Sequence, residues 1–337
     1  MRPDGNNHRR SHSYIAFSLR FLVGRRMDGA GDVFQLRGVM GELKAGVAGA
    51  GVFGGFHAKK YASLEGVRLA RVFDVDLDRA KALAEPLGAE AVDDLGTFVA
   101  GLDVVTVASP GFTHAEIASR ALSAGASVYV EKPLAVTVDD AEKLVALAAE
   151  HGRVLACGHQ ERVVFEAMGL TTLPKAPLRL SALRRGTPNT RNRDISCVLD
   201  LMIHDLDLAL ILMGEEALAV EAEGEFDAVR AEVTFANGAT ASFEASRIAE
   251  ARERRFEAVF DEGAVAIDFL APSFENTTPF ALNPNFADSP AAKDPLGVSV
   301  TRFLAAVRGE GVRPIATGLD GERALDLALA VEHAAGL

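Results

Sequence analysis

The sequence predicts an α/β protein in which a Rossmann-type doubly wound parallel sheet precedes an α+β domain with a mostly antiparallel open sheet. Three observations lead to this prediction. Short β-branched runs alternate with helical patterns between Leu43 and His159, which is the form of repeated βαβ units. After Met168 the pattern changes to polar-apolar alternation around the turn signals Asn237-Gly238 and Glu262-Gly263. The length of 337 residues also exceeds that of most single domains.

The expected elements follow in order along the chain. In a first domain, residues 43–160, parallel strands are expected at 43–49, 67–74, 89–94, 102–110, 126–133 and 153–159. Helices are expected between them at 53–64, 76–88, 114–125 and 138–152. In a second domain, residues 161–337, we expect a helix at 197–214, strands between 219 and 271, a loop at 272–295, and closing helices at 296–309 and 320–335.

The composition is that of a folded, acidic protein. Hydrophobic residues make up 49% of the chain and charged residues 24%, and the formal net charge is -12. This charge disfavours nucleic acid as a partner, and no apolar run approaches the roughly 18 residues of a membrane span. Two cysteines, Cys157 and Cys197, are too few for a disulfide framework and favour the cytoplasm. Because these cysteines, His159 and His204 lack the short spacing of zinc ligands, no metal is predicted.

Residues 1–42 differ from the rest of the chain. They are rich in arginine and contain an apolar patch that Arg20 interrupts, which argues against a secretory signal. The pair Arg9-Arg10 leaves twin-arginine export as a second interpretation. We expect a disordered extension, or a start assigned too early, with Met40 as a sensible start just before the first strand.

A glycine motif between the first strand and the first helix predicts a dinucleotide site. Gly49, Gly51 and Gly54 form G-x-G-x-x-G, with Val52 and Phe53 at the mouth of the helix. In this context the glycines permit a tight turn and a close approach to a pyrophosphate at the helix N-terminus.

Asp74, which ends the second strand 20 residues after Gly54, predicts the choice of cofactor. Its carboxylate can accept hydrogen bonds from both ribose hydroxyls and would repel a 2′-phosphate. No arginine follows at positions 75 or 76 to reverse that sign, and Asp76 is expected to cap the next helix. We therefore predict NAD rather than NADP.

Three ordered motifs resemble the glucose-fructose oxidoreductase / inositol dehydrogenase / rhizopine catabolism family. They are Glu131-Lys132-Pro133 after the fifth strand, "CGHQER" at the domain junction, and the D-x-x-x-H pattern from Asp200 to His204. The resemblance runs from about Leu43 to the C-terminus. It implies NAD(P)-dependent oxidation or reduction of sugars, cyclitols or sugar nucleotides.

The resemblance also implies site residues. Lys132 matches the catalytic lysine, Asp200 its orienting carboxylate, and His204 the usual acid/base. The residues that would border the cofactor, besides the glycine motif, Asp74 and Lys132, are Ser109, Pro110, His114 and Glu131. Two departures weaken the assignment to a subgroup: Gly111 replaces the asparagine that many members have, and "VVF" follows Arg162 where the subgroup has "FNP".

The chemistry of alcohol oxidation agrees with these residue types. A base must remove the hydroxyl proton while a cation polarises the oxygen, and the i, i+4 spacing of Asp200 and His204 lets both face one cleft. Arg162, Arg184 or Arg185 could bind a phosphate or carboxylate on the substrate.

Two other functions occur in such a family: NAD-dependent glycoside hydrolysis and ligand sensing without catalysis. The presence of Lys132, Asp200 and His204 favours an enzyme over a sensor. We also expect a homodimer or homotetramer, because the open face of the second sheet would otherwise expose apolar residues.

Overall fold

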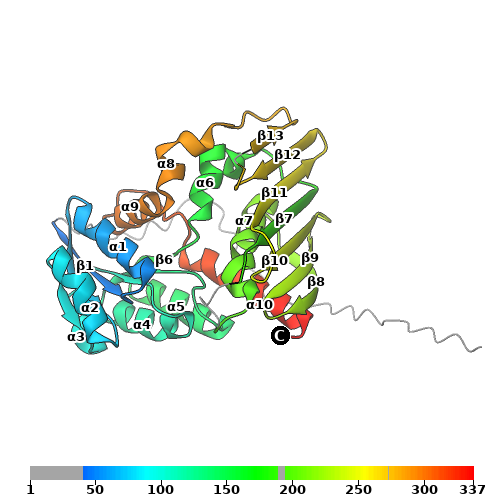
Figure 1. The fold of residues 1–337 in the computed structure, drawn as a ribbon. Helices are drawn as coiled ribbons and strands as arrows, with labels where there is room; N and C mark the ends of the chain where they lie inside the picture. Colours follow the sequence, from blue (N-terminus) through cyan, green and yellow to red (C-terminus); the bar gives the residue numbers. More distant parts are fainter. Residues whose placement is uncertain (1–40, 189–193, 272) are drawn as a thin grey trace, which may run out of the picture.

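The computed structural model describes residues 41–188, 194–271 and 273–337. Figure 1 shows two units side by side, each built on one sheet, with helices between the sheets. The predicted extension, residues 1–42, lies outside the described residues except for Gly41 and Glu42, and its role stays a prediction.

The first sheet is the predicted doubly wound parallel sheet. In the described residues its strand order is β3-β2-β1-β4-β5-β6. The strands are β1 Leu43–Ala48, β2 Val67–Phe73, β3 Glu90–Val92, β4 Val104–Val107, β5 Ser127–Val130 and β6 Leu155–Cys157. Every residue of β4 and β5 is buried, as expected for strands covered on both faces. The order reverses between β1 and β4, so ligands are expected at the carboxyl ends of these strands.

Helices cover both faces of the first sheet. They are α1 Val52–Ser63, α2 Leu77–Ala84, α3 Leu95–Val99, α4 His114–Ser123 and α5 Val138–Glu150. As predicted, the Asp76 carboxylate caps α2, because it accepts hydrogen bonds from the amides of Asp78 and Arg79. Asp94 and Thr137 cap α3 and α5 in the same way. Helices α4 and α5 pack on one face of the sheet and α1 packs on the other.

The second sheet is mostly antiparallel, as predicted. Its order is β13-β12-β11-β7-β10-β9-β8, and among the described strands only β7 and β10 pair in parallel. The strands are β7 Arg179–Arg185, β8 Ala217–Glu225, β9 Ala228–Phe235, β10 Thr240–Ser246, β11 Glu253–Phe260, β12 Gly263–Asp268 and β13 Ser273–Asn276. Buried and exposed residues alternate along β9, so one face packs against the core and the other stays open.

The buried face of the second sheet packs against α6 Glu161–Met168, α7 Ile203–Met213 and α10 Gly318–Ala335. Helix α10 also contacts α5 of the first unit, and Figure 1 shows it running between the two sheets. A capping box at Thr317 and Asp320 fixes the start of α10. These contacts hold the two sheets in one arrangement.

The structure differs from the sequence prediction at four places. Strand β7, in the middle of the second sheet, and strand β13, inside the predicted loop, were not expected. Helix α9 Pro295–Val307, predicted as part of the second domain, packs instead on the first sheet through Val300 and Phe303. The second hairpin turns at Asp261 and Glu262, so Gly263 already pairs with Phe260. An apolar stripe has the same pattern whichever sheet it packs on, so the sequence could not place α9.

The helix predicted at 197–214 begins as a π-helix. This segment, η4 Val198–Met202, continues directly into α7. Asp200 lies in the π segment and His204 in the first turn of α7. Such π segments inside helices often occur at functional sites.

Candidate active site

The loop after β1 has the backbone geometry that a dinucleotide requires. Gly49 has a φ of +100°, and a Cβ there would lie 2.6 Å from the carbonyl oxygen of Ala108. A Cβ at Gly54 would collide with the carbonyl oxygen of Gly49, so α1 can start this close to β1 only with glycine. Beyond Gly51 the space is open, because the nearest neighbour of a Cβ there is Arg79 at 3.9 Å. The loop and the amides of Val52 and Phe53 therefore fit a pyrophosphate.

Asp74 is fixed beside this loop by two backbone amides. Its Oδ2 accepts a hydrogen bond from the Ala50 amide at 2.8 Å, and its Oδ1 accepts one from the Asp76 amide at 3.0 Å. Positions 75 and 76 hold no arginine, as the sequence analysis noted, but an arginine further along the chain lies beside this carboxylate. The first turn of α2 brings Nη2 of Arg79 to 3.8 Å from Oδ2. The ribose end of the site thus contains a carboxylate and a neighbouring guanidinium.

His114 joins the loop after β4 to the segment that follows β5. Its Nδ1 lies 2.7 Å from the carbonyl oxygen of Pro133, and its Nε2 lies 2.9 Å from that of Ser109. Burial lowers the pKa of His114, so the neutral ring donates to one of these two oxygens. The hydroxyl of Ser109 pairs with that of Thr113 at 2.7 Å. The polar groups of this predicted cofactor loop, Ser109-Pro110 included, thus hold the loop against the Lys132-Pro133 segment.

Glu131 is buried and anchors the end of β5. Its Oε1 lies 2.7 Å from Nε2 of His57 and 2.8 Å from Nε2 of Gln160. These partners come from α1 and from the start of α6, so the carboxylate fixes the position of Lys132 from two sides. Its predicted contact with the cofactor stays a prediction.

Lys132 and Asp200 meet across the two units. Nζ of Lys132 donates a hydrogen bond to the carbonyl oxygen of Asp200 at 2.7 Å and lies 3.4 Å from its Oδ1. Burial lowers the pKa of Lys132, and the negative charge of Asp200 opposes that shift. Arg247, directly after β10, places Nη1 3.5 Å from Oδ2 of Asp200. The sequence analysis missed Arg247, because nothing local distinguishes it from other arginines near strand ends.

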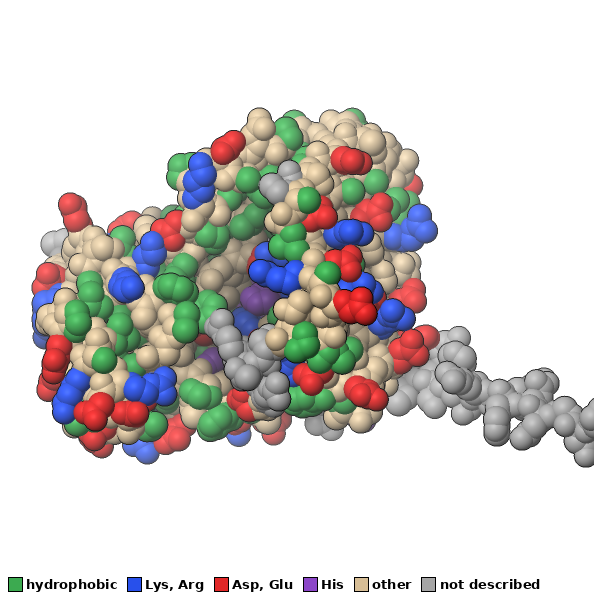
Figure 2. Space-filling view, viewed as in Figure 1, with side chains coloured by type: hydrophobic (Ala, Val, Ile, Leu, Met, Phe, Trp, Pro, Cys, Tyr) green, Lys and Arg blue, Asp and Glu red, His purple; other side chains and the backbone are tan. Residues whose placement is uncertain are grey.

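His204 lies one turn after Asp200 and is half-buried. Its Nδ1 is buried and has no hydrogen-bond partner among the described residues. The pKa of His204 is well below its ordinary value, first because of burial and then because of positive charge on its neighbours, which are Lys132, Arg184, His159 and Arg254. The ring is therefore neutral near pH 7 and can accept a proton. Figure 2 shows a histidine side chain beside Lys or Arg side chains in the hollow between the two units.

The structure corrects the prediction that Arg162 and Arg185 bind substrate. Arg162 is buried, and its guanidinium pairs with Asp207 and Asp320. Arg185 pairs with Glu244 and Glu253 on the open face of the second sheet, away from Lys132 and His204.

Arg184 behaves differently, because it projects from the other face of β7 and lies near His204. There it forms ion pairs with Asp205 and Glu161. The sequence alone could not show which of the two arginines lies on the face toward His204. Consecutive residues of a strand point to opposite faces of the sheet.

The described residues contain neither a candidate metal site nor a helix that could span a membrane. No group of three or more His, Cys, Asp or Glu side chains there could hold a metal ion. No helix in these ranges is long and apolar enough to cross a bilayer. Cys157 and Cys197 are both buried and unpaired.

Comparison with known proteins identifies the family. Residues 43–159 match the family described as oxidoreductase, NAD-binding Rossmann fold, and residues 181–266 match the GFO/IDH/MocA C-terminal domain. The UDP-N-acetylglucosamine 3-dehydrogenase of Acidithiobacillus ferrooxidans is 34% identical over 309 residues, which cover 87% of this chain and 97% of that enzyme. The chain belongs to the GFO/IDH/MocA oxidoreductase family.

Further relatives agree with this membership. A solved structure of the same Acidithiobacillus enzyme has a TM-score of 0.80 and 33% identity, covering 88% of this chain and 98% of that one. The inositol 2-dehydrogenase of Ralstonia nicotianae is 32% identical over 53% of this chain and 57% of its own length. The family resemblance and NAD as cofactor are confirmed. This GFO/IDH/MocA protein is an NAD-dependent oxidoreductase, as predicted, and its named relatives are dehydrogenases of a sugar nucleotide and of inositol.

Asp74 and Arg79 together should set the preference between NAD and NADP. Replacing Asp74 by serine removes the charge that repels a 2′-phosphate and leaves the guanidinium beside it. A charge-assisted hydrogen bond contributes about 1.5–3 kcal/mol, so the preference for NAD should narrow by about 10-fold or more. In the double variant Asp74→Ser/Arg79→Ala the preference for NAD should narrow much less, because the guanidinium is also gone. Calorimetric titration with NAD and with NADP measures the ratio of the two affinities.

The matched control is Asp78→Ser. Asp78 is an exposed carboxylate on the same turn of α2, and its replacement should leave the ratio of affinities unchanged. The interpretation fails if the wild type binds NADP more tightly, or if the double variant gains as much NADP affinity as Asp74→Ser.

His204 should control the acidic limb of the pH-rate profile. Because the base must be unprotonated and the pKa of His204 is lowered, oxidation should decline only below about pH 6.5, the ordinary histidine value. His204→Ala should lower kcat by about 10²–10⁴-fold and leave NAD affinity nearly unchanged. NADH absorbance at saturating substrate measures both. The exposed His151→Ala is the control, and an unchanged acidic limb in His204→Ala would assign the base elsewhere.

Proposed function

We propose that the protein oxidises the C3 hydroxyl of a sugar nucleotide of the UDP-N-acetylglucosamine type with NAD. The observation that carries this proposal is the 34% identity to the Acidithiobacillus 3-dehydrogenase, which extends over both units and 97% of that enzyme. The scyllo-inositol 2-dehydrogenase of Bacillus subtilis covers the same 87% of this chain but is only 25% identical. The higher identity over the same length favours the sugar nucleotide as substrate.

The proposed mechanism assigns one task to each site residue. Oxidation of a secondary alcohol transfers the C–H electron pair as a hydride and releases the O–H proton. Bound NAD supplies the hydride acceptor at the nicotinamide. The ammonium of Lys132 donates a hydrogen bond to the substrate oxygen and stabilises its developing negative charge. His204 accepts the proton, and Asp200 holds Lys132 in place and balances its charge.

This division of tasks requires both units. Lys132 follows β5 of the first sheet, whereas Asp200 and His204 lie on the η4-α7 helix that packs under the second sheet. A substrate must therefore lie between the units to contact both groups. Since UDP-sugars and NAD are metabolites of the cytoplasm and both cysteines are unpaired, we place the reaction there.

A substrate comparison tests the function. NADH formation should be fastest with UDP-N-acetylglucosamine, and slower with UDP-glucose, free N-acetylglucosamine or myo-inositol. The product should be a 3-keto sugar nucleotide, lighter by two hydrogen atoms in mass spectrometry. Lys132→Ala is the control that shows whether turnover depends on this site. It should form neither NADH nor the keto product. Preference for myo-inositol would contradict the proposal, and release of free sugar without net NADH would indicate oxidative glycoside hydrolysis.

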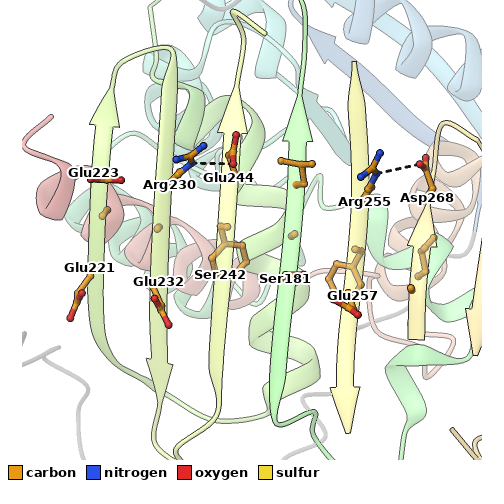
Figure 3. A pocket seen from close by; sticks show the side chains of 18 of the residues that line it. Ser181, Glu221, Glu223, Arg230, Glu232, Ser242, Glu244, Arg255, Glu257 and Asp268 are labelled. Carbon is orange, nitrogen blue, oxygen red and sulfur yellow. Dashed lines mark hydrogen bonds and ion pairs between the residues drawn. The ribbon is translucent and has the colours of Figure 1, made fainter. Parts of the chain in front are cut away.

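We propose the open face of the second sheet as the contact between copies of this chain. The expected reason for this contact was wrong, because the face carries mostly charged and polar side chains instead of exposed apolar ones. In Figure 3 its side chains point into one broad hollow, where Arg230 and Arg255 lie among carboxylates such as Glu244 and Asp268. The charged groups alternate with small residues such as Ser242, also seen in Figure 3. A two-fold contact places the same patch on both sides, so a face with both signs of charge can complement itself.

A substitution at the middle of this face tests the contact. Ser242→Arg should convert a dimer or larger assembly to monomer in sedimentation velocity, because it adds a long cation to both sides of a two-fold interface. Ser63→Arg, on the exposed end of α1, should leave the assembly unchanged. A monomeric wild type, or an unchanged assembly in Ser242→Arg, would overturn the proposal.

A further inference from the structure

His159 is a second histidine beside the site that the mechanism above does not use. It follows β6 as Lys132 follows β5: Val130 and Cys157 pair in the sheet, and each lies two residues before one of these side chains. Lys132 and His159 therefore reach the same edge of the sheet. His159 is only 1% exposed, and in the described residues neither of its ring nitrogens has a hydrogen-bond partner.

Two groups face the His159 ring. Its Nδ1 lies 3.7 Å from Oδ2 of Asp207, a fully buried carboxylate that also pairs with Arg162. On another side is His204, with ring centroids 6.4 Å apart and planes at 84°. Nδ1 of His204 is likewise buried and has no hydrogen-bond partner among the described residues. Buried polar groups are almost always hydrogen-bonded in folded proteins, so three unpartnered nitrogens on these two neighbouring rings require a physical explanation.

We propose that Asp207, His159 and His204 form a chain that holds His204 in the tautomer able to accept the substrate proton. His159 is thus a positioning residue, and one buried water molecule links the two rings. Their 6.4 Å centroid separation is too long for a direct hydrogen bond and suits a single bridging water. This inference rests on the proposed role of His204 as base.

The tautomer of His159 follows from Asp207. The Asp207 carboxylate lies 3.7 Å from Nδ1, too far for a hydrogen bond, but its negative charge favours a proton on Nδ1 and so leaves a lone pair on Nε2. This lone pair accepts a hydrogen bond from the bridging water, which in turn accepts one from Nδ1–H of His204. Nε2 of His204 then carries the lone pair. When the hydroxyl proton bonds to Nε2, the new cation keeps its Nδ1–H in the same chain and no further proton has to move.

Other charges around His204 do not replace this chain. The groups whose charges act on His204 are Lys132 after β5, Arg184 on β7, Arg254 on β11 and His159 itself. Lys132 has only donors, and Arg184 and Arg254 likewise donate, so none of the three can accept a proton from Nδ1 of His204. Asp200, one turn earlier on the same helix, directs its two carboxylate oxygens toward Lys132 and Arg247. Among the four groups whose charges act on His204, His159 is the one with a lone pair to offer.

Nitrogen-15 NMR of the imidazoles, assigned with His204→Ala, tests the chain directly. In the wild type, His204 should be the Nδ1–H tautomer. In His159→Phe it should shift toward the Nε2–H tautomer, with kcat at least about 10-fold lower but less reduced than in His204→Ala, which loses about 10²–10⁴-fold. KM and NAD affinity should change little. His159→Gln should recover part of the loss, since its amide oxygen can accept the same hydrogen bond.

The exposed His151→Phe is the matched control and should leave tautomer and kcat unchanged. An Nε2–H tautomer in the wild type would overturn the proposal, even if His159→Phe failed to fold. Equal losses in the Phe and Gln variants with an unchanged tautomer would also overturn it, because they would show a purely structural role. If His204→Ala stays fully active, the proposed base is wrong, and the tautomer comparison still decides whether the chain exists.

Discussion

The contact between Lys132 and Asp200 is the interaction on which the rest of the site depends. It joins a strand end of the first sheet to the π segment under the second sheet, so it exists only when the two units are packed together. Burying a lysine disfavours its charged form, and Asp200 offsets that cost. Arg247 in turn lies against the other oxygen of Asp200 and limits how far the carboxylate can move. The site is therefore a property of the arrangement of the units and not of either one.

Buried ion pairs surround this contact and occupy most charges near His204. Arg162 pairs with Asp207 and Asp320 from two other helices, and Arg184 pairs with Asp205 and Glu161. Losing one partner of a buried pair leaves an uncompensated charge and costs about 3–5 kcal/mol. These pairs therefore fix the helices that carry the site. Burial, followed by the positive charges of Lys132, Arg184 and Arg254, lowers the pKa of His204, so its ring stays neutral and able to act as a base.

The two faces of the second sheet differ in the side chains they carry and in what they contact. One is apolar and packs on α6, α7 and α10, so it supports the helix that carries Asp200 and His204. The other is charged and hollow, and is proposed to contact a second copy. Because strand residues alternate between faces, Arg184 and Arg185 take part in different functions although they are neighbours in the sequence.

The sequence by itself determined what depends on neighbouring residues. The order of strands and helices in the first unit, the glycine turn, the Asp76 cap and the Lys132 and Asp200–His204 motifs are all local patterns. Tertiary structure decided what depends on distant segments meeting: the central position of β7, the packing of α9 on the first sheet, and the approach of Arg247 to Asp200. It also brought His159 to His204, two residues 45 positions apart. Packing of apolar faces sets these contacts, and an apolar stripe does not specify which surface will cover it.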